Sequence, residues 1–214
     1  MKNFIALDTS GEYLTVIAEK GEKTRIIFEE NCAMQHSVRL MDAIEEAAGD
    51  VGLAPAECDF FCAAVGPGSF TGIRIGISAV KGLCAATGKP ALGVTTFAAL
   101  AYNAEEKALA VIPAGRGDHY VCGFGEDKSV VYPPAVVGED VLRELSKEYA
   151  VYAYAPLPVP YRRANPAAGL LAAAESAKAE NFGPLAAFYL KKSQAEAELL
   201  KKTQGKTGDA PAKG

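Results

Sequence analysis

The stretch that decides the fold reads Ala64-Val65-Gly66-Pro67-Gly68-Ser69-Phe70-Thr71-Gly72-Ile73-Arg74-Ile75-Gly76. Residues 60–65 form an apolar run, which is typical of a buried strand. The glycines and the proline then indicate a tight turn, because glycine tolerates unusual backbone angles and proline fixes its own φ. Residues 73–87 are apolar or small on nearly every side and predict a helix, with Ser69 and Thr71 as candidate N-caps.

This strand–turn–helix has two interpretations. Exposed amides at the start of a helix can hold an anion such as phosphate. The stretch lacks the lysine of a Walker motif, however, and short glycine patterns often match by chance. The spacing alone therefore favours a tight turn in front of a buried helix.

The helix at residues 73–87 carries only two charges, Arg74 and Lys81, which lie on one face. A surface helix would show a full polar half. The sequence therefore predicts that both sides are covered, one by a sheet. The second cover is either another part of a large domain or a partner chain, which the small residues Gly72, Gly76 and Ala79 would allow to come close.

Composition restricts the class of protein. The chain has 214 residues, half of them hydrophobic, and a net charge of −4, which disfavours strong nucleic-acid binding by the chain alone. The odd number of cysteines, mostly in apolar runs, predicts buried free thiols. We find no signal segment and no apolar run of membrane-spanning length, so a cytoplasmic protein without membrane contact is expected.

The order of elements predicts an α/β protein built from two βββαβα units. In the first half, strands are expected at 4–7, 13–19, 24–30, 60–65 and 91–94, and helices at 35–48, 73–87 and 96–103. In the second half, strands are expected at 108–112, 120–124, 130–132 and 149–154, and helices at 139–145 and 166–179. The predicted subdomains are 1–104 and 105–198, followed by a disordered tail at 199–214.

A doubled βββαβα unit resembles the actin-like ATPase fold of actin, hexokinase and heat-shock ATPases. Three stretches more specifically resemble the bacterial TsaB (YeaZ) family, and the match is best over the first hundred residues. They are Ile5-Ala6-Leu7-Asp8-Thr9-Ser10, the segment from Gly66 to Gly76, and Tyr189-Leu190-Lys191-Lys192-Ser193-Gln194-Ala195-Glu196.

The resemblance implies a non-catalytic scaffold subunit of the complex that installs threonylcarbamoyl on adenosine beside the tRNA anticodon. It implies a TsaD-like paralogue and a TsaE-like ATPase as partners, a homodimer in isolation, and contact with tRNA only through the complex. The helices expected at 35–48 and 73–87 would form the contact. The expected interface residues are His36, Leu40, Met41, Ile44, Ile73, Arg74, Ile77, Val80, Lys81 and Cys84.

The first turn, Asp8-Thr9-Ser10-Gly11, occupies the place of a phosphate loop in actin-like folds, and we expect at most a vestigial, weak nucleotide site there. The family usually carries Asp-Ala-Arg at the start of the second half, but this chain has Pro113-Ala114-Gly115 with Arg116 next, and it retains Tyr120. No metal is expected, because the only histidines, His36 and His119, are far apart. The alternative is a stand-alone actin-fold phosphotransferase or ATPase acting on a small metabolite.

Overall fold

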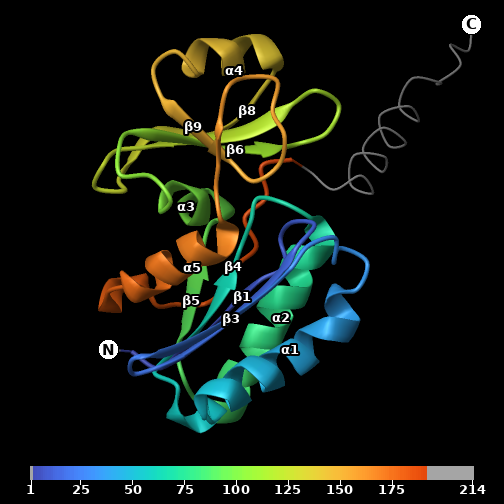
Figure 1. Ribbon diagram of the computed structural model, residues 1–214, viewed down its shortest axis with the longest axis vertical. Helices are drawn as coiled ribbons and strands as arrows, with labels where there is room; N and C mark the ends of the chain where they lie inside the picture. The colour runs from blue at the N-terminus through green and yellow to red at the C-terminus, as the bar shows by residue number, and fades with distance from the viewer. Residues whose placement is uncertain (1, 192–214) are drawn as a thin grey trace, which may run out of the picture.

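The computed structural model describes residues 2–191, so the predicted tail at 199–214 lies outside the described residues. Five layers follow one another from α1 and α2 at one side of the molecule to α4 at its far end (Figure 1). They are helices α1 and α2, a first sheet, helices α3 and α5, a second sheet, and helix α4. Helix α5 packs mainly on the first sheet and α3 mainly on the second, so these two helices separate the sheets.

The first sheet has the strand order β3-β2-β1-β4-β5. Strands β1 to β3 form an antiparallel meander, and β4 and β5 are parallel to β1. Both faces of β1 and β4 are covered, which explains why every residue in these strands is buried. The bounds are β1 Phe4–Asp8, β2 Leu14–Lys20, β3 Lys23–Glu29, β4 Phe60–Ala64 and β5 Ala91–Val94.

Helices α1 (His36–Val51) and α2 (Phe70–Thr87) cover one face of the first sheet. Helix α1 ends at Gly52, which adopts the left-handed conformation that favours glycine. Helix α2 begins at Ser69, whose hydroxyl accepts a hydrogen bond from the Gly72 amide, as predicted for an N-cap. The short turn η1 (Pro55–Glu57) connects α1 to β4.

The second sheet repeats the topology of the first. Its order is β10-β9-β6-β7-β8, with an antiparallel meander of three strands followed by two parallel strands. Helix α4 (Glu139–Leu145) takes the place of α1, but no described helix corresponds to α2, because the proline-rich residues 156–160 lead from β9 to β10. The strands are β6 Ala108–Pro113, β7 His119–Phe124, β8 Val130–Val137, β9 Ala150–Ala153 and β10 Arg162–Arg163. The doubled unit and the strand order that both sheets share make this an actin-like fold.

Helices α3 (Thr96–Ala101) and α5 (Pro166–Glu175) pack so closely that a Cβ atom at Gly169 would lie 1.7 Å from the Ala99 carbonyl oxygen. The side chain of Asn103 ties the end of α3 to the start of α5 by bonding both the amide and the carbonyl of Asn165 (2.8 and 3.2 Å). This pair separates the two sheets and forms the base of the space between them.

After α5 and the turn η2 (Ala179–Asn181), the chain crosses back over both sheets. We call residues 182–191 the strap. Phe182 forms a bridge to Leu92 beside β5, and the Phe188 amide donates to the Val65 carbonyl (2.7 Å). At its end, Lys191 pairs with Asp118 in the second sheet's first turn (2.8 Å). The strap therefore ties the two sheets together.

The predicted elements are present with small shifts of their ends. The predicted strand at 130–132 continues to Val137, and the helix at 166–179 ends at Glu175. Strand β10 and the strap were not predicted, since two arginines and a run of mixed residues show no periodicity. Residues 108–132 lie in the second sheet and not in the first, and the subdomain boundaries at 104 and 198 stay a prediction.

Candidate functional site

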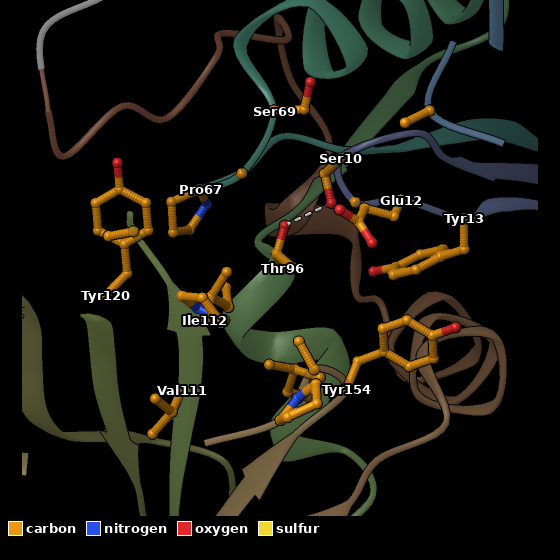
Figure 2. Close-up of a pocket in the computed structure, with 18 of the residues that line it drawn as sticks. Ser10, Glu12, Tyr13, Pro67, Ser69, Thr96, Val111, Ile112, Tyr120 and Tyr154 are labelled. Atoms are coloured by element: carbon orange, nitrogen blue, oxygen red, sulfur yellow. Dashed lines mark hydrogen bonds between the residues drawn. The ribbon is translucent and has the colours of Figure 1, made fainter. Parts of the chain in front are cut away.

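A cleft of about 660 Å³ lies between the two sheets (Figure 2). A volume of this size lies within the range of small-molecule sites. From the first sheet it is lined by the turn after β1 and the turn before α2, and from the second by the end of β6 and by β7. The residues used below are Ser10, Glu12, Tyr13, Thr96, Tyr120, Tyr154, Tyr161 and Arg163.

The polar groups of the first turn are already used within the protein. Asp8 is fully buried and accepts hydrogen bonds from the Ser10 amide (2.7 Å) and the Tyr13 hydroxyl (3.0 Å). Burial raises the pKa of the Asp8 carboxyl, while these two bonds oppose the shift. The Thr9 hydroxyl donates to the Gly72 carbonyl (2.7 Å). This turn therefore offers little to a phosphate.

The glycines of the deciding stretch let α2 pack directly against this turn. A Cβ atom would lie 1.9 Å from the Thr9 carbonyl oxygen at Gly72, and 2.3 Å from the Ser10 carbonyl oxygen at Gly68. The Ser69 amide donates to the same Ser10 carbonyl (2.7 Å). The absence of side chains at these positions thus serves close backbone packing.

The second turn, where the resemblance would place an aspartate, carries no carboxylate toward the cleft. Pro113 and Ala114 line the cleft there, while Gly115, Arg116 and Gly117 form an exposed turn with positive φ angles. Asp118, at the end of this turn, is held by Lys191, which also donates to the Ala114 carbonyl (3.1 Å). Tyr120 is retained and lines the cleft.

A magnesium nucleotide does not fit these residues. Such a ligand needs carboxylates for the cation and free donors for the phosphates. The first carboxylate, Asp8, is bonded internally, and the second is missing. Among residues 2–191, no group of three or more His, Cys, Asp or Glu lies together as a metal site would require.

One side of the cleft is closed by a cluster that sequence reasoning missed. Glu30, after β3, accepts hydrogen bonds from the Tyr154 hydroxyl (2.8 Å) and from Arg163 (3.1 Å). The Arg163 guanidinium also lies over the Tyr154 ring, and that ring meets Tyr13 edge-on at 4.8 Å. The three polar residues are separated by up to 133 positions in sequence, so no local pattern points to the cluster.

The residues predicted for an interface divide into two groups. Six have their side chains buried within this chain, beneath the surface of α1 and α2: His36, Leu40, Ile44, Ile73, Ile77 and Val80. Met41, Arg74 and Lys81 are exposed, and Cys84 is half-buried. On α1 and α2, the side chains that a partner could reach are therefore mostly those of the second group and its neighbours.

Those neighbours form a groove of about 500 Å³ between α1 and α2, which includes Met41, Phe70 and Arg74. Arg74 lies over the Phe70 ring at 3.8 Å and donates to the Tyr189 hydroxyl (3.1 Å), while Tyr189 stacks on Phe70. Beside the groove, Met34 and Val38 are 94% and 77% exposed. We call Met34, Val38, Met41 and the groove the α1–α2 surface.

Neither histidine lines the cleft or the groove between α1 and α2. The His36 ring is buried and its Nε2 lies 2.9 Å from the Tyr13 carbonyl, which ties the start of α1 to β2. His119 is buried at the start of β7, in the other sheet. The structure does not bring them together.

A pH-dependent group lies away from the cleft, at Glu19 on β2. Burial raises the pKa of its carboxyl to about 7, and the neighbouring Glu175 adds to the shift. Lys2, which also lies there, donates to the Glu175 and Ala177 carbonyls. The folded state thus holds a proton that the unfolded chain loses near pH 4.5.

We therefore expect stability to fall as the pH rises from about 4.5 to about 7, because the ionised Glu19 is penalised only in the folded state. Glu19→Gln should raise the free energy of unfolding at pH 8 by about 2 kcal/mol and flatten the pH dependence. Urea unfolding at pH 5 and pH 8 checks this, with Glu22→Gln as a control on the same surface. Equal slopes in parent and Glu19→Gln would contradict it.

No helix within residues 2–191 is long and apolar enough to cross a membrane.

Comparisons with known proteins agree with the fold. The family model described as "TsaD: tRNA N6-adenosine threonylcarbamoyltransferase" matches residues 20–149. The chain is 24% identical, over 89% of its length and all of the other chain, to a structure of a protein "with similarity to peptidase YEAZ" from Pseudomonas aeruginosa (TM-score 0.77). It is 26% identical to YeaZ from the same organism, covering 82% and 91% of the two chains (TM-score 0.67).

Several curated relatives carry the name "tRNA threonylcarbamoyladenosine biosynthesis protein TsaB". The Escherichia coli protein is 29% identical over 68% of this chain and 68% of its own length. The Haemophilus influenzae protein is 33% identical over 54% of this chain and 51% of its own length. The matched segment thus spans about half to two thirds of these relatives.

Proposed function

Because this chain belongs to the TsaB (YeaZ) family and carries a TsaD-type domain, we propose that it acts in the biosynthesis of threonylcarbamoyladenosine in tRNA. Within that pathway, its role is that of a non-catalytic subunit which docks onto a TsaD-like paralogue. The single observation that carries this role is the first turn of the cleft, whose carboxylate and hydroxyls are bonded within the protein.

A stand-alone phosphotransferase is less well supported. That activity needs a base and donors that are free to meet the substrate. Asp8 is enclosed by Ser10 and Tyr13, and the second turn presents Pro113 and Ala114 to the cleft. We therefore expect no nucleotide hydrolysis above background from the purified chain, and turnover that disappears in Asp8→Ala would overturn this assignment.

The docking site that we propose is the α1–α2 surface. Exposed apolar side chains gathered on one face usually mark a contact. Met34, Val38 and Met41 lie together near the start of α1, and the groove beside them is lined by Phe70 and Arg74 of α2. The exposed part of α2 also carries Gly82 and Ala85, which allow another helix to come close.

The occupant of this surface is the TsaD-like paralogue, and a second copy of the chain competes for it when the paralogue is absent. We expect Met41→Glu to weaken binding to a TsaD paralogue at least tenfold, since the charge would be buried in the contact. Analytical ultracentrifugation of the chain alone and titration against the paralogue measure the two associations. Met41→Glu should also weaken the self-association of the chain.

Val130→Glu is the matched control, because Val130 is 56% exposed, close to the 55% of Met41, but lies on β8 in the second sheet. It should leave both associations unchanged. If Met41→Glu and Val38→Glu stay folded and bind the paralogue like the parent, the docking site lies elsewhere. If Val130→Glu alone weakens binding, the second sheet carries the contact.

The other expected partners remain part of this proposal. The net charge of −4 gives tRNA phosphates little attraction to this chain, so we assign contact with tRNA to the assembled complex. The TsaE-like ATPase is expected to join the pair. Co-purification of the three proteins with and without Met41→Glu tests whether TsaE needs the docked pair or binds this chain directly.

A further inference from the structure

The cleft between the sheets has lost the features of a phosphate site but remains open. Aromatic rings line it from both sheets: Tyr13 from the first, and Tyr120, Tyr154 and Tyr161 from the second. Figure 2 shows Tyr13 and Tyr154 on one side and Tyr120 on the other, with Ile112 between them. Such walls suit a flat ring, because stacked and edge-on aromatic contacts both favour planar ligands.

The charge in the cleft is also unlike that of a phosphate site. Two charged side chains line it, Glu12 and Arg163. Arg163 is paired with Glu30, whereas no ion pair involves Glu12 within residues 2–191. Figure 2 shows the Glu12 side chain between Ser10 and Tyr13. The cleft is thus lined by an exposed carboxylate, which would repel a phosphate.

Two helices begin at the cleft, and their first turns would attract an anion if their amides were free. The caps already use part of this capacity. The Ser69 and Thr95 hydroxyls accept from the Gly72 and Ala98 amides. Another polar group in the cleft wall is the hydroxyl pair of Ser10 and Thr96, 3.0 Å apart, which can accept as well as donate hydrogen bonds.

We propose that this cleft binds a small ligand with a flat ring and a hydrogen-bond-donating, cationic group, and not a phosphorylated one. The ring lies between the tyrosines, and the donating group pairs with Glu12. This site is independent of the α1–α2 surface, since the cleft and the groove share no lining residue.

Three probes of nearly equal shape separate charge from shape: benzamidinium, benzamide and benzoate. Protein chemical shifts are followed as each is titrated into the full chain. We expect benzamidinium to bind with a millimolar Kd, as a fragment of this size should, benzamide several-fold more weakly, and benzoate least. ATP with Mg²⁺ should not displace benzamidinium.

Two variants test the residues that carry the proposal. Glu12→Gln should lower the affinity for benzamidinium about fivefold and leave that for benzamide unchanged, because it removes only the charge. Tyr120→Ala should weaken the binding of both benzamidinium and benzamide. If Tyr120→Ala does not fold, Tyr161→Ala is measured in its place. Glu126→Gln, an exposed carboxylate on another loop, is the control and should change nothing.

Three results would overturn the proposal. The first is benzoate binding as tightly as benzamidinium. The second is an affinity for benzamidinium that Glu12→Gln leaves unchanged. The third is no change in the chemical shifts of cleft residues with any probe at a concentration 20 times the expected Kd. Failure here leaves the proposed docking role intact, since that role is measured with Met41→Glu.

Discussion

Gly72→Ala is expected to destabilise this protein by about 3 kcal/mol, although it adds a single methyl group within a helix. The new Cβ atom would lie 1.9 Å from the Thr9 carbonyl oxygen and 3.3 Å from the Ser69 side chain. The first obstacle is backbone, and it belongs to a turn that is held by the Thr9 and Asp8 hydrogen bonds. Helix α2 must therefore move away from the turn.

Thermal unfolding measures this loss, and for a chain of this size about 3 kcal/mol corresponds to a fall in Tm of roughly 6–12 °C. Gly82→Ala is the matched control. Gly82 lies in the same helix, is exposed, and has open space where its Cβ would be. That change should raise stability by about 0.5–1 kcal/mol, because alanine is the better helix former. Equal effects at both positions would contradict the packing argument.

This pair of glycines also shows what the sequence can and cannot reveal. The stretch before α2 predicts a strand, a turn and a helix, and all three are present. The spacing favours a tight turn over a phosphate loop, but both interpretations account for the glycines, since both need a missing side chain. Only the position of Thr9, 63 residues earlier, decides between them.

Long-range contacts explain why the sequence did not predict some other features of the structure. The doubled order of elements along the chain follows from local patterns, because each strand and helix has its own hydrophobic period. The cluster of Glu30, Tyr154 and Arg163 depends on three distant segments meeting, and the strap depends on a crossing after α5. Glu12 was not singled out, since a glutamate in a polar turn resembles any exposed residue.

The sequence does not show which of the predicted interface residues are buried and which are exposed, for a different reason. Helix α2 is apolar or small on almost every side, so its period does not show which face meets the sheet. The structure places Ile73, Ile77 and Val80 inward and Arg74, Ser78 and Lys81 outward. The inward residues pack in the core beneath the proposed docking surface.

A negative charge at Val80 is therefore expected to unfold the chain and not merely to prevent docking. Val80 is 0% exposed and packs in the core between α2 and the first sheet. Burying a carboxylate there without a partner, or exposing the core to admit water, costs more than about 4 kcal/mol. Ile77→Glu should behave in the same way, since Ile77 is 6% exposed in the same cluster.

Ser78→Glu provides the comparison, because Ser78 is exposed and lines the groove of the α1–α2 surface. This variant should keep the circular dichroism spectrum of the parent and lose association with the paralogue. Val80→Glu should lose the cooperative thermal transition itself. If Val80→Glu folds like the parent while Ser78→Glu does not, α2 is turned by about half a rotation, and both the core and the docking surface assigned here are wrong.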